Sequence, residues 1–568
     1  MRGKRSWAGA GGRDAAIITR MTEPILAVRD LIVDFRVDRK PFRAVDGLNF
    51  DVMPGEILAL VGESGSGKSV TAMSILGLLP DNATRTGSIH FEGKDLVDMT
   101  EKELTAIRGG DISMIFQDPI AALNPVFTIG FQMGEAVKLQ NSSLNREQVD
   151  AKSVELLSQV GIPDAAGRLG YYPHQLSGGQ CQRIMIAMAL AGEPRLLIAD
   201  EPTTALDVTV QAEVLDVLRR LHGRLGTSIM IITHDMGVVA DLADRVVVMR
   251  EGRPVETNDV RSLFHRPQAA YTQELLAAVP RIGEKTAPSV MNKGELVLDI
   301  QDLVVEFGFR LRHKFRAVDS VSLKVHVGEI TALVGESGSG KTTIGRCAIG
   351  LTPITSGTIS VAGVQLSHAK RAQITEMRKR VGVVFQNPAT SLDPRLTIGA
   401  IVAEPMRVLT DLRGAPLRNR VRELLDSVEL RGDWSERYPR EMSGGQLQRV
   451  SIARAVALDP LLLIADEPTS ALDVSVQAKI LDLFRELQLR LGFACLFISH
   501  NLAVVDTLCD RVAVMKKGVL VEQGDRERVF RDPQHEYTRQ LIDCCPVPDP
   551  DEQRVRRDAR LARVPSLL

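Results

Sequence analysis

Two short segments have the residues and spacing that bind the phosphates of a nucleotide. GESGSGKS occupies residues 62–69, and GESGSGKT repeats it at residues 335–342. Glycines let backbone N–H groups surround phosphate oxygens, and a helix that begins at the lysine adds a favourable dipole. The residues expected to bind the nucleotide are Gly62, Ser64, Gly65, Gly67, Lys68 and Ser69 in the first segment, and Gly335, Ser337, Gly338, Gly340, Lys341, Thr342 and Thr343 in the second.

A metal site is expected beside each phosphate-binding segment. The hydroxyl groups of Ser69 and Thr342 are suited to Mg²⁺ that accompanies the phosphates. The apolar run LLIAD ends in Asp200 and is repeated with Asp466 at its end, so each copy places a carboxylate at the tip of an expected strand. These four side chains predict one metal site in each copy.

The next residue in both copies is a glutamate, which supplies the expected general base. A carboxylate beside the metal and the terminal phosphate can orient or deprotonate an attacking water, so Glu201 and Glu467 are the predicted catalytic bases. His234 and His500 follow at matching positions, each at the end of an expected strand. We therefore expect both histidines to contact the terminal phosphate.

A third motif, SGGQ, has no role in a single phosphate site. Ser177, Gly178, Gly179 and Gln180 form it in the first copy, and Ser443, Gly444, Gly445 and Gln446 form it in the second. Ser-Gly-Gly before a helix makes another anion-binding helix terminus. No phosphate in the same copy requires this terminus.

The order of these motifs repeats along the chain, which indicates two duplicated domains. We place the domains at residues 23–280 and 296–546, with a polar linker at 281–295, a disordered extension at 1–22 and a charged tail at 547–568. Met21 is a plausible alternative start. Apolar runs at 56–62, 196–200, 228–234 and 245–249 predict buried strands of a mostly parallel α/β sheet. The segment between Gln117 and Ser177 predicts an inserted helical subdomain.

Composition narrows the class of protein. The chain has 568 residues, 44% of them hydrophobic, and a formal net charge of −1, so it lacks the overall positive charge that favours nucleic acid. No apolar run is long enough to suggest a membrane span. The six cysteines form no CxxC motif and are expected to be reduced thiols.

With this ordered motif set the chain resembles the nucleotide-binding domains of ABC ATPases over about residues 25–546. The resemblance implies two P-loop domains, each with a RecA-like core and a helical subdomain, that hydrolyse ATP with Mg²⁺. It implies two composite head-to-tail sites, each joining the P-loop of one domain to the SGGQ motif of the other. It adds Gln117 and Gln386 as metal-binding residues, Asp207 and Asp473 as signal-carrying residues, and Phe42 and Phe315 as aromatic residues that stack on adenine or belong to the core.

Two further features resemble the peptide/nickel importer group. Gln117 is followed by DPIAALNP, and Gln386 is followed by NPATSLDP. Each copy closes with Pro-x-x-x-Tyr-Thr, at 267–272 and 533–538. The resemblance implies a fused ATP-binding subunit on the cytoplasmic face of a bacterial membrane. Its expected partners are two transmembrane permease subunits, docked near 117–130 and 386–399, and an extracytoplasmic solute-binding protein.

Short peptides are the expected cargo, with nickel chelates, glutathione and haem as alternatives. Some relatives carry four cysteines for an iron–sulfur cluster, but no such set follows residue 280 or 546 here. A soluble tandem ABC protein of translation or DNA repair is the alternative from another class. The short linker and the missing zinc-binding cysteines argue against it.

Overall fold

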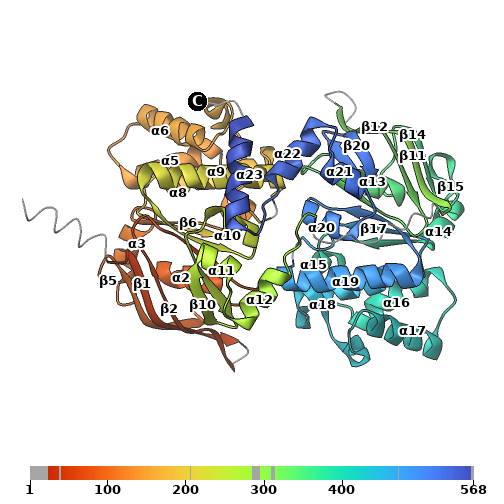
Figure 1. Cartoon of the computed structure of the whole chain (residues 1–568), viewed down its shortest axis with the longest axis horizontal. Helices are drawn as coiled ribbons and strands as arrows, with labels where there is room; N and C mark the ends of the chain where they lie inside the picture. Colours follow the sequence, from red (N-terminus) through yellow and green to blue (C-terminus); the bar gives the residue numbers. More distant parts are fainter. Residues whose placement is uncertain are drawn as a thin grey trace, which may run out of the picture. The chain divides into compact units, whose positions relative to one another are not determined.

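The computed structural model describes residues 23–37, 40–204, 206–283, 294–308, 314–470 and 472–563. The chain divides into two compact units, the first formed mainly by residues up to Leu276 and the second mainly by Ala277–Cys545. Figure 1 shows that each unit combines strands and helices. The extension expected at 1–22 lies outside the described residues, as do residues 284–293 of the expected linker.

Unit 1 contains a six-stranded sheet whose strands β3, β7 and β8 are buried along their whole length. Its order is β10-β9-β3-β8-β7-β6, and only β10 pairs antiparallel to its neighbour. Strands that are buried on both faces are typical of parallel sheets. The bounds are β3 Ile57–Val61, β6 Ile112–Ile115, β7 Leu196–Asp200, β8 Ser228–Thr233, β9 Arg245–Arg250 and β10 Arg253–Asp259. The predicted mostly parallel sheet is confirmed.

A second, antiparallel sheet lies in the same unit, in the order β2-β1-β4-β5. It consists of β1 Leu26–Val37, β2 Lys40–Val52, β4 Ala83–Phe91 and β5 Lys94–Asp95. Helix α2 (Lys68–Leu76) contacts β2 and β7, and its buried Ile75 belongs to a core that contains residues of both sheets. The helix that begins at Lys68, the lysine expected to bind phosphate, is therefore anchored between the two sheets.

The helical subdomain expected after Gln117 is present. Helices α5, α6 and α8 pack together in unit 1 (Figure 1). The remaining helices border the sheets or connect their strands. The helices of this half are α3 Glu101–Ile107, α4 Pro119–Ala122, α5 Ile129–Gln140, α6 Arg146–Gln159, α7 Ala165–Arg168, η1 Pro173–Gln175, α8 Gly178–Leu190, α9 Val208–Leu225, α10 Met236–Leu242, α11 Val260–His265 and α12 Ala270–Ala277.

Unit 2 repeats both sheets with the same connectivity. Its six-stranded sheet has the order β16-β17-β18-β13-β19-β20, and its antiparallel sheet has the order β12-β11-β14-β15. The bounds are β11 Leu296–Phe307, β12 Phe315–His326, β13 Ile330–Gly335, β14 Ser356–Val361, β15 Val364–Gln365, β16 Val381–Val384, β17 Leu462–Asp466, β18 Ala494–Ile498, β19 Arg511–Lys516 and β20 Val519–Asp525.

The helices of the second half follow the same plan. They are α13 Lys341–Ala348, η2 Leu366–His368, α14 Arg371–Arg378, α15 Pro388–Ser391, α16 Ile398–Leu409, α17 Gly414–Ser427, η3 Gly432–Glu436, η4 Pro439–Glu441, α18 Gly444–Ala455, α19 Val474–Leu491, α20 Leu502–Leu508, α21 Arg526–Arg531 and α22 Glu536–Cys544. The expected charged tail contains one more helix, α23 (Pro550–Arg563). Among the described residues, no helix has the length and apolar character needed to cross a membrane.

Candidate functional site

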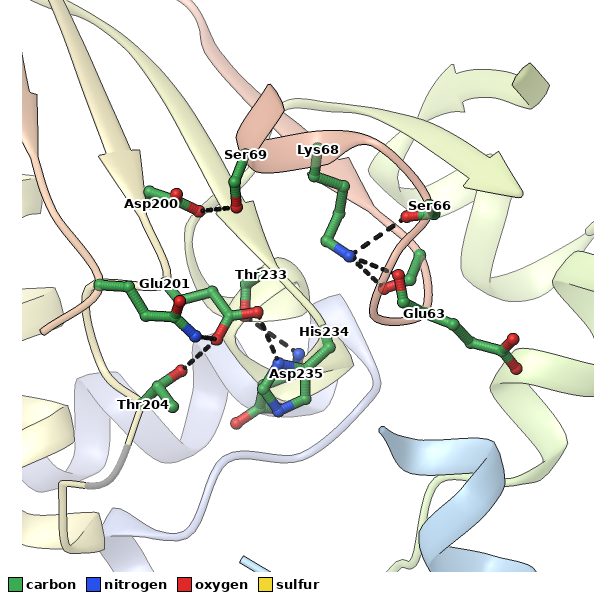
Figure 2. Close-up of polar contacts among 12 residues, drawn as sticks. Glu63, Ser66, Lys68, Ser69, Asp200, Glu201, Thr204, Thr233, His234 and Asp235 are labelled. Atoms are coloured by element: carbon green, nitrogen blue, oxygen red, sulfur yellow. Dashed lines mark hydrogen bonds and ion pairs between the residues drawn. The ribbon is translucent and has the colours of Figure 1, made fainter. Parts of the chain in front are cut away.

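The first phosphate-binding segment forms a loop between β3 and α2. Gly67 has φ 95° and caps the helix, a conformation that side chains rarely adopt. Lys68 is buried, and its Nζ donates to the carbonyl oxygens of Gly62 at 2.8 Å and Glu63 at 2.7 Å. Figure 2 shows this lysine inside the curve of the loop. The ammonium group is thus held where the loop would surround phosphate.

The expected metal-binding side chains of each copy lie together. Ser69 Oγ donates to Asp200 Oδ1 at 3.1 Å, and Thr342 Oγ1 donates to Asp466 Oδ1 at the same distance. Burial, together with the adjacent Glu201, raises the pKa of Asp200 to about 6, against the effect of the Ser69 hydrogen bond. Burial raises the pKa of Asp466 as well. In each copy a buried carboxylate lies beside a hydroxyl group. Because hard cations prefer oxygen ligands, this pair is suited to bind one.

Each expected general base is held by the side chains predicted to share its site. Gln117 Nε2 donates to Glu201 Oε2 at 2.8 Å, and His234 Nδ1 lies 3.1 Å from Glu201 Oε1. The second copy repeats both contacts at Glu467, from Gln386 at 2.8 Å and from His500 at 3.1 Å. The structure therefore brings these glutamine, glutamate and histidine side chains together in each unit.

The two neighbouring carboxyl groups differ in their acidity. Burial of Glu201 favours its neutral form, but the hydrogen bond and charge of His234, the Thr204 hydrogen bond and the charge of Lys68 together outweigh this effect and lower the pKa to about 2. The pKa of Glu467 is lowered in the same way, because His500, Lys341 and Gln386 together outweigh burial. Glu201 is therefore ionised at neutral pH and can accept a hydrogen bond from water.

The backbone at each expected general base is strained. Glu201 has φ 46° and Glu467 has φ 47°, in the left-handed region that costs a non-glycine residue about 1–3 kcal/mol. The Glu201 N–H donates to Ile232 O at 2.8 Å, and the Glu467 N–H donates to Ile498 O at 2.9 Å. The neighbouring strand thus holds each glutamate in this conformation, which sequence analysis missed.

Thr204 is a further contact that sequence analysis missed. Its Oγ1 donates to Glu201 Oε2 at 2.9 Å (Figure 2), whereas Ser470 in the second copy donates to the Glu467 carbonyl oxygen at 3.2 Å. The sequences EPTT and EPTS at these positions carry the only signal of this difference. The two glutamate carboxylates consequently have different hydrogen-bond environments.

The SGGQ motifs begin helices as expected. Ser177 Oγ accepts from the Gln180 N–H at 3.3 Å, while Gln180 Oε1 accepts from the Ser177 N–H at 3.1 Å. Ser443 and Gln446 form the same capping box at the start of α18. This arrangement fixes the N-terminus of each helix.

The remaining predicted residues are two phenylalanines and two aspartates. Phe42 and Phe315 are 57% and 63% exposed, so neither ring is part of the core and both are open to stacking. Asp207 directly precedes α9, and Asp473 is the N-cap residue of α19.

Comparisons with known proteins show which family the sequence matches. The family described as ABC transporter matches residues 45–204 and 318–470, and the C-terminal region of oligopeptide/dipeptide transporters matches 255–302 and 521–567. The glutathione import ATP-binding protein GsiA of Escherichia coli (strain K12) is 44% identical, covering 94% of this chain and 91% of that protein. GsiA of Salmonella paratyphi A is 42% identical, with coverage of 95% and 93%.

A solved dimeric ATP-binding cassette, described as a post-hydrolysis state bound to ADP and Pi, is 26% identical with a TM-score of 0.38. The match covers 42% of this chain and 99% of that chain.

The contacts of Glu201 and Glu467 predict the effect of replacing them. Glu201→Gln together with Glu467→Gln should retain ATP binding and lower steady-state ATP hydrolysis by about 10²–10⁴-fold, the usual contribution of a general base. Each single substitution should also slow hydrolysis substantially. Glu155→Gln, on the exposed face of α6, is the control and should hydrolyse ATP normally. Full activity in Glu201→Gln alone would contradict two working sites.

The raised pKa of Asp200 predicts that replacing this aspartate stabilises the protein, by an amount that depends on pH. Folding disfavours the charged form of Asp200, so ionised Asp200 lowers the free energy of unfolding above about pH 6. This destabilisation disappears as the pH falls toward 4. Asp200→Asn should therefore raise the free energy of unfolding by roughly 1–3 kcal/mol at pH 7.5, and by much less at pH 4.5. Chemical denaturation without nucleotide or Mg²⁺ measures this difference. An equal gain at both pH values would contradict the assignment.

Proposed function

We propose that this chain powers the import of short peptides. The premise is that it belongs to the ABC transporter family, as an ATP-binding subunit of oligopeptide/dipeptide importers. The match of both closing regions to the C-terminal region of oligopeptide/dipeptide transporters carries this proposal. Relatives at 44% identity are named for import of glutathione, which is itself a tripeptide. We therefore include glutathione among the peptides to be tested first.

ATP hydrolysis by the chain follows from its family, and the site residues have proposed roles within it. Lys68 and Lys341 bind the phosphates, Glu201 and Glu467 orient or deprotonate the attacking water, and the adjacent histidine contacts the terminal phosphate. The pairing of each P-loop with the SGGQ motif of the other copy is a proposal that rests on the family resemblance.

We propose that Mg²⁺ joins each ATP. Ser69 and Asp200 would hold it in the first copy, Thr342 and Asp466 in the second, and Gln117 and Gln386 would turn to it from their glutamates. The hydroxyl–carboxylate pairs at 3.1 Å support this choice, because hard cations prefer oxygen ligands. When bound, Mg²⁺ would neutralise charge on the phosphates.

The permease partners are expected to dock on the segments that follow Gln117 and Gln386. In unit 1 this surface is apolar: Ile120 and Val126 are 65% and 71% exposed, and the rings of Phe127 and Phe131 stack at 4.4 Å. Exposed apolar patches of this kind mark sites of protein association. We infer that it binds a cytoplasmic helix of a permease subunit, and that an extracytoplasmic solute-binding protein delivers the cargo. The chain would then act at the cytoplasmic face of the membrane.

The alternative of a soluble tandem ATPase in translation or DNA repair lacks support. The chain carries the transporter C-terminal region twice, and relatives named for import align over 94% of its length.

Uptake by living cells tests the cargo. Lys68→Ala together with Lys341→Ala removes both phosphate-binding ammonium groups, so cells with this variant should lose uptake of radiolabelled di- and tripeptides, glutathione included. Lys102→Ala, on the exposed face of α3, is the control and should transport normally. Unchanged peptide uptake together with lost nickel or haem acquisition would overturn the proposed cargo and leave the importer mechanism intact.

The stacked phenylalanines test the docking surface. Phe127→Ala with Phe131→Ala should reduce recovery of the permease subunits with this chain from detergent-solubilised membranes, because apolar contact area is lost. The ATP hydrolysis of the purified chain alone should be unchanged. Leu139→Ala alters a side chain that is 83% exposed on α5, the helix that carries Phe131, and should not affect recovery. Normal recovery of the double variant would exclude this surface.

A further inference from the structure

The closing motif of each domain, residues 267–272 and 533–538, is attached to the last strand of the six-stranded sheet. Glu522 on β20 accepts hydrogen bonds from the backbone N–H groups of Gln534 at 2.8 Å and His535 at 3.1 Å. In unit 1, Glu256 on β10 accepts from Gln268 and Ala269, both at 3.0 Å. The attachment is therefore a property of the motif, repeated in both units.

The tyrosine of the motif is held beneath a cation. Tyr537 is 2% exposed, and Lys516 Nζ at the end of β19 lies 4.4 Å from its ring centroid. In unit 1, the Arg250 guanidinium lies 4.8 Å from the ring of Tyr271. A cation over an aromatic face is attracted by the ring electrons and limits the ring's movement. The ring of Tyr537 therefore has a fixed place beside the strand end.

The hydroxyl of Tyr537 reaches the P-loop. It accepts a hydrogen bond from the backbone N–H of Glu336 at 3.2 Å, across 201 residues of sequence. The carbonyl oxygen of the same Glu336 accepts from Lys341 Nζ at 2.8 Å. One P-loop residue thus joins the closing motif on one side to the phosphate-binding lysine on the other.

The start of the P-loop lies directly against the strand that carries Lys516. A Cβ atom added to Gly335 would lie 2.1 Å from the carbonyl oxygen of Met515, so only glycine allows this approach. Farther along the loop, Ser339 O accepts from the Gly518 N–H at 3.0 Å, in the turn between β19 and β20. The β19–β20 hairpin and the closing motif together contact Gly335, Glu336 and Ser339 of the P-loop.

We propose that Tyr537 is a positioning residue for ATP binding, and that the closing motif holds the P-loop of the second domain in its binding conformation through the Glu336 peptide. The motif thereby gains a function in the ATPase cycle besides completing the fold. A tyrosine that served only the core would affect stability and leave nucleotide affinity unchanged.

The test is Tyr537→Phe, which keeps the ring beneath Lys516 and removes only the hydroxyl. In a Lys68→Ala background, binding of a fluorescent ATP analogue with Mg²⁺ reports on the second P-loop. We expect the Kd to rise about fivefold, the usual effect of one lost hydrogen bond. In the background with Lys68 intact, the KM for ATP should rise while kcat changes little.

Tyr171→Phe, at an exposed tyrosine in unit 1, is the matched control and should leave the Kd unchanged. An unchanged Kd in folded Tyr537→Phe, with or without a lower unfolding temperature, would overturn the proposal. If Tyr537→Phe fails to fold, Glu522→Gln loosens the same attachment without touching the ring. It should raise the Kd in the same direction, and an unchanged Kd would again overturn the proposal.

Discussion

Two consecutive carboxyl groups at the end of a buried strand are the constraint on which each nucleotide site depends. Asp200 and Glu201 lie side by side and largely out of water: burial raises the pKa of Asp200, and repulsion from the adjacent Glu201 raises it further. The surrounding groups offset this repulsion: a hydroxyl on Asp200, an amide and an imidazole on Glu201. At the end of this strand, the two carboxyl groups therefore contact the first turn of α2, the glutamine segment and the histidine.

The same constraint explains why the backbone turns as it does. A regular strand would send consecutive side chains to opposite faces of the sheet. The left-handed conformation of Glu201 and Glu467 interrupts this alternation directly after the aspartate, and a hydrogen bond to the next strand secures it. Strain at this position is thus tied to placing the carboxylate where the glutamine and histidine meet it.

Local signals in the sequence predicted much of the fold and the site. The apolar run LLIAD, the glycine spacing of the P-loop and the Ser-Gly-Gly helix starts each depend on neighbouring residues, and all three form as expected. The strained glutamate and the bond from Glu336 to Tyr537 could not be predicted, because they depend on how distant strands and helices are brought together. Periodicity describes which face a residue occupies, and contains no information about its partner 201 residues away.

The two copies share the contacts of the glutamate and differ in the surface that follows the glutamine. The glutamate contacts of glutamine and histidine have equal lengths in both units, 2.8 and 3.1 Å, as expected for chemistry that both copies share. The surface after the glutamine differs: Phe127 and Phe131 in unit 1 correspond to Leu396 and Ala400 in unit 2, where an Asp393–Arg395 ion pair adds charge. Since identical surfaces would select identical partners, this divergence supports the proposal that the two domains dock on different permease subunits.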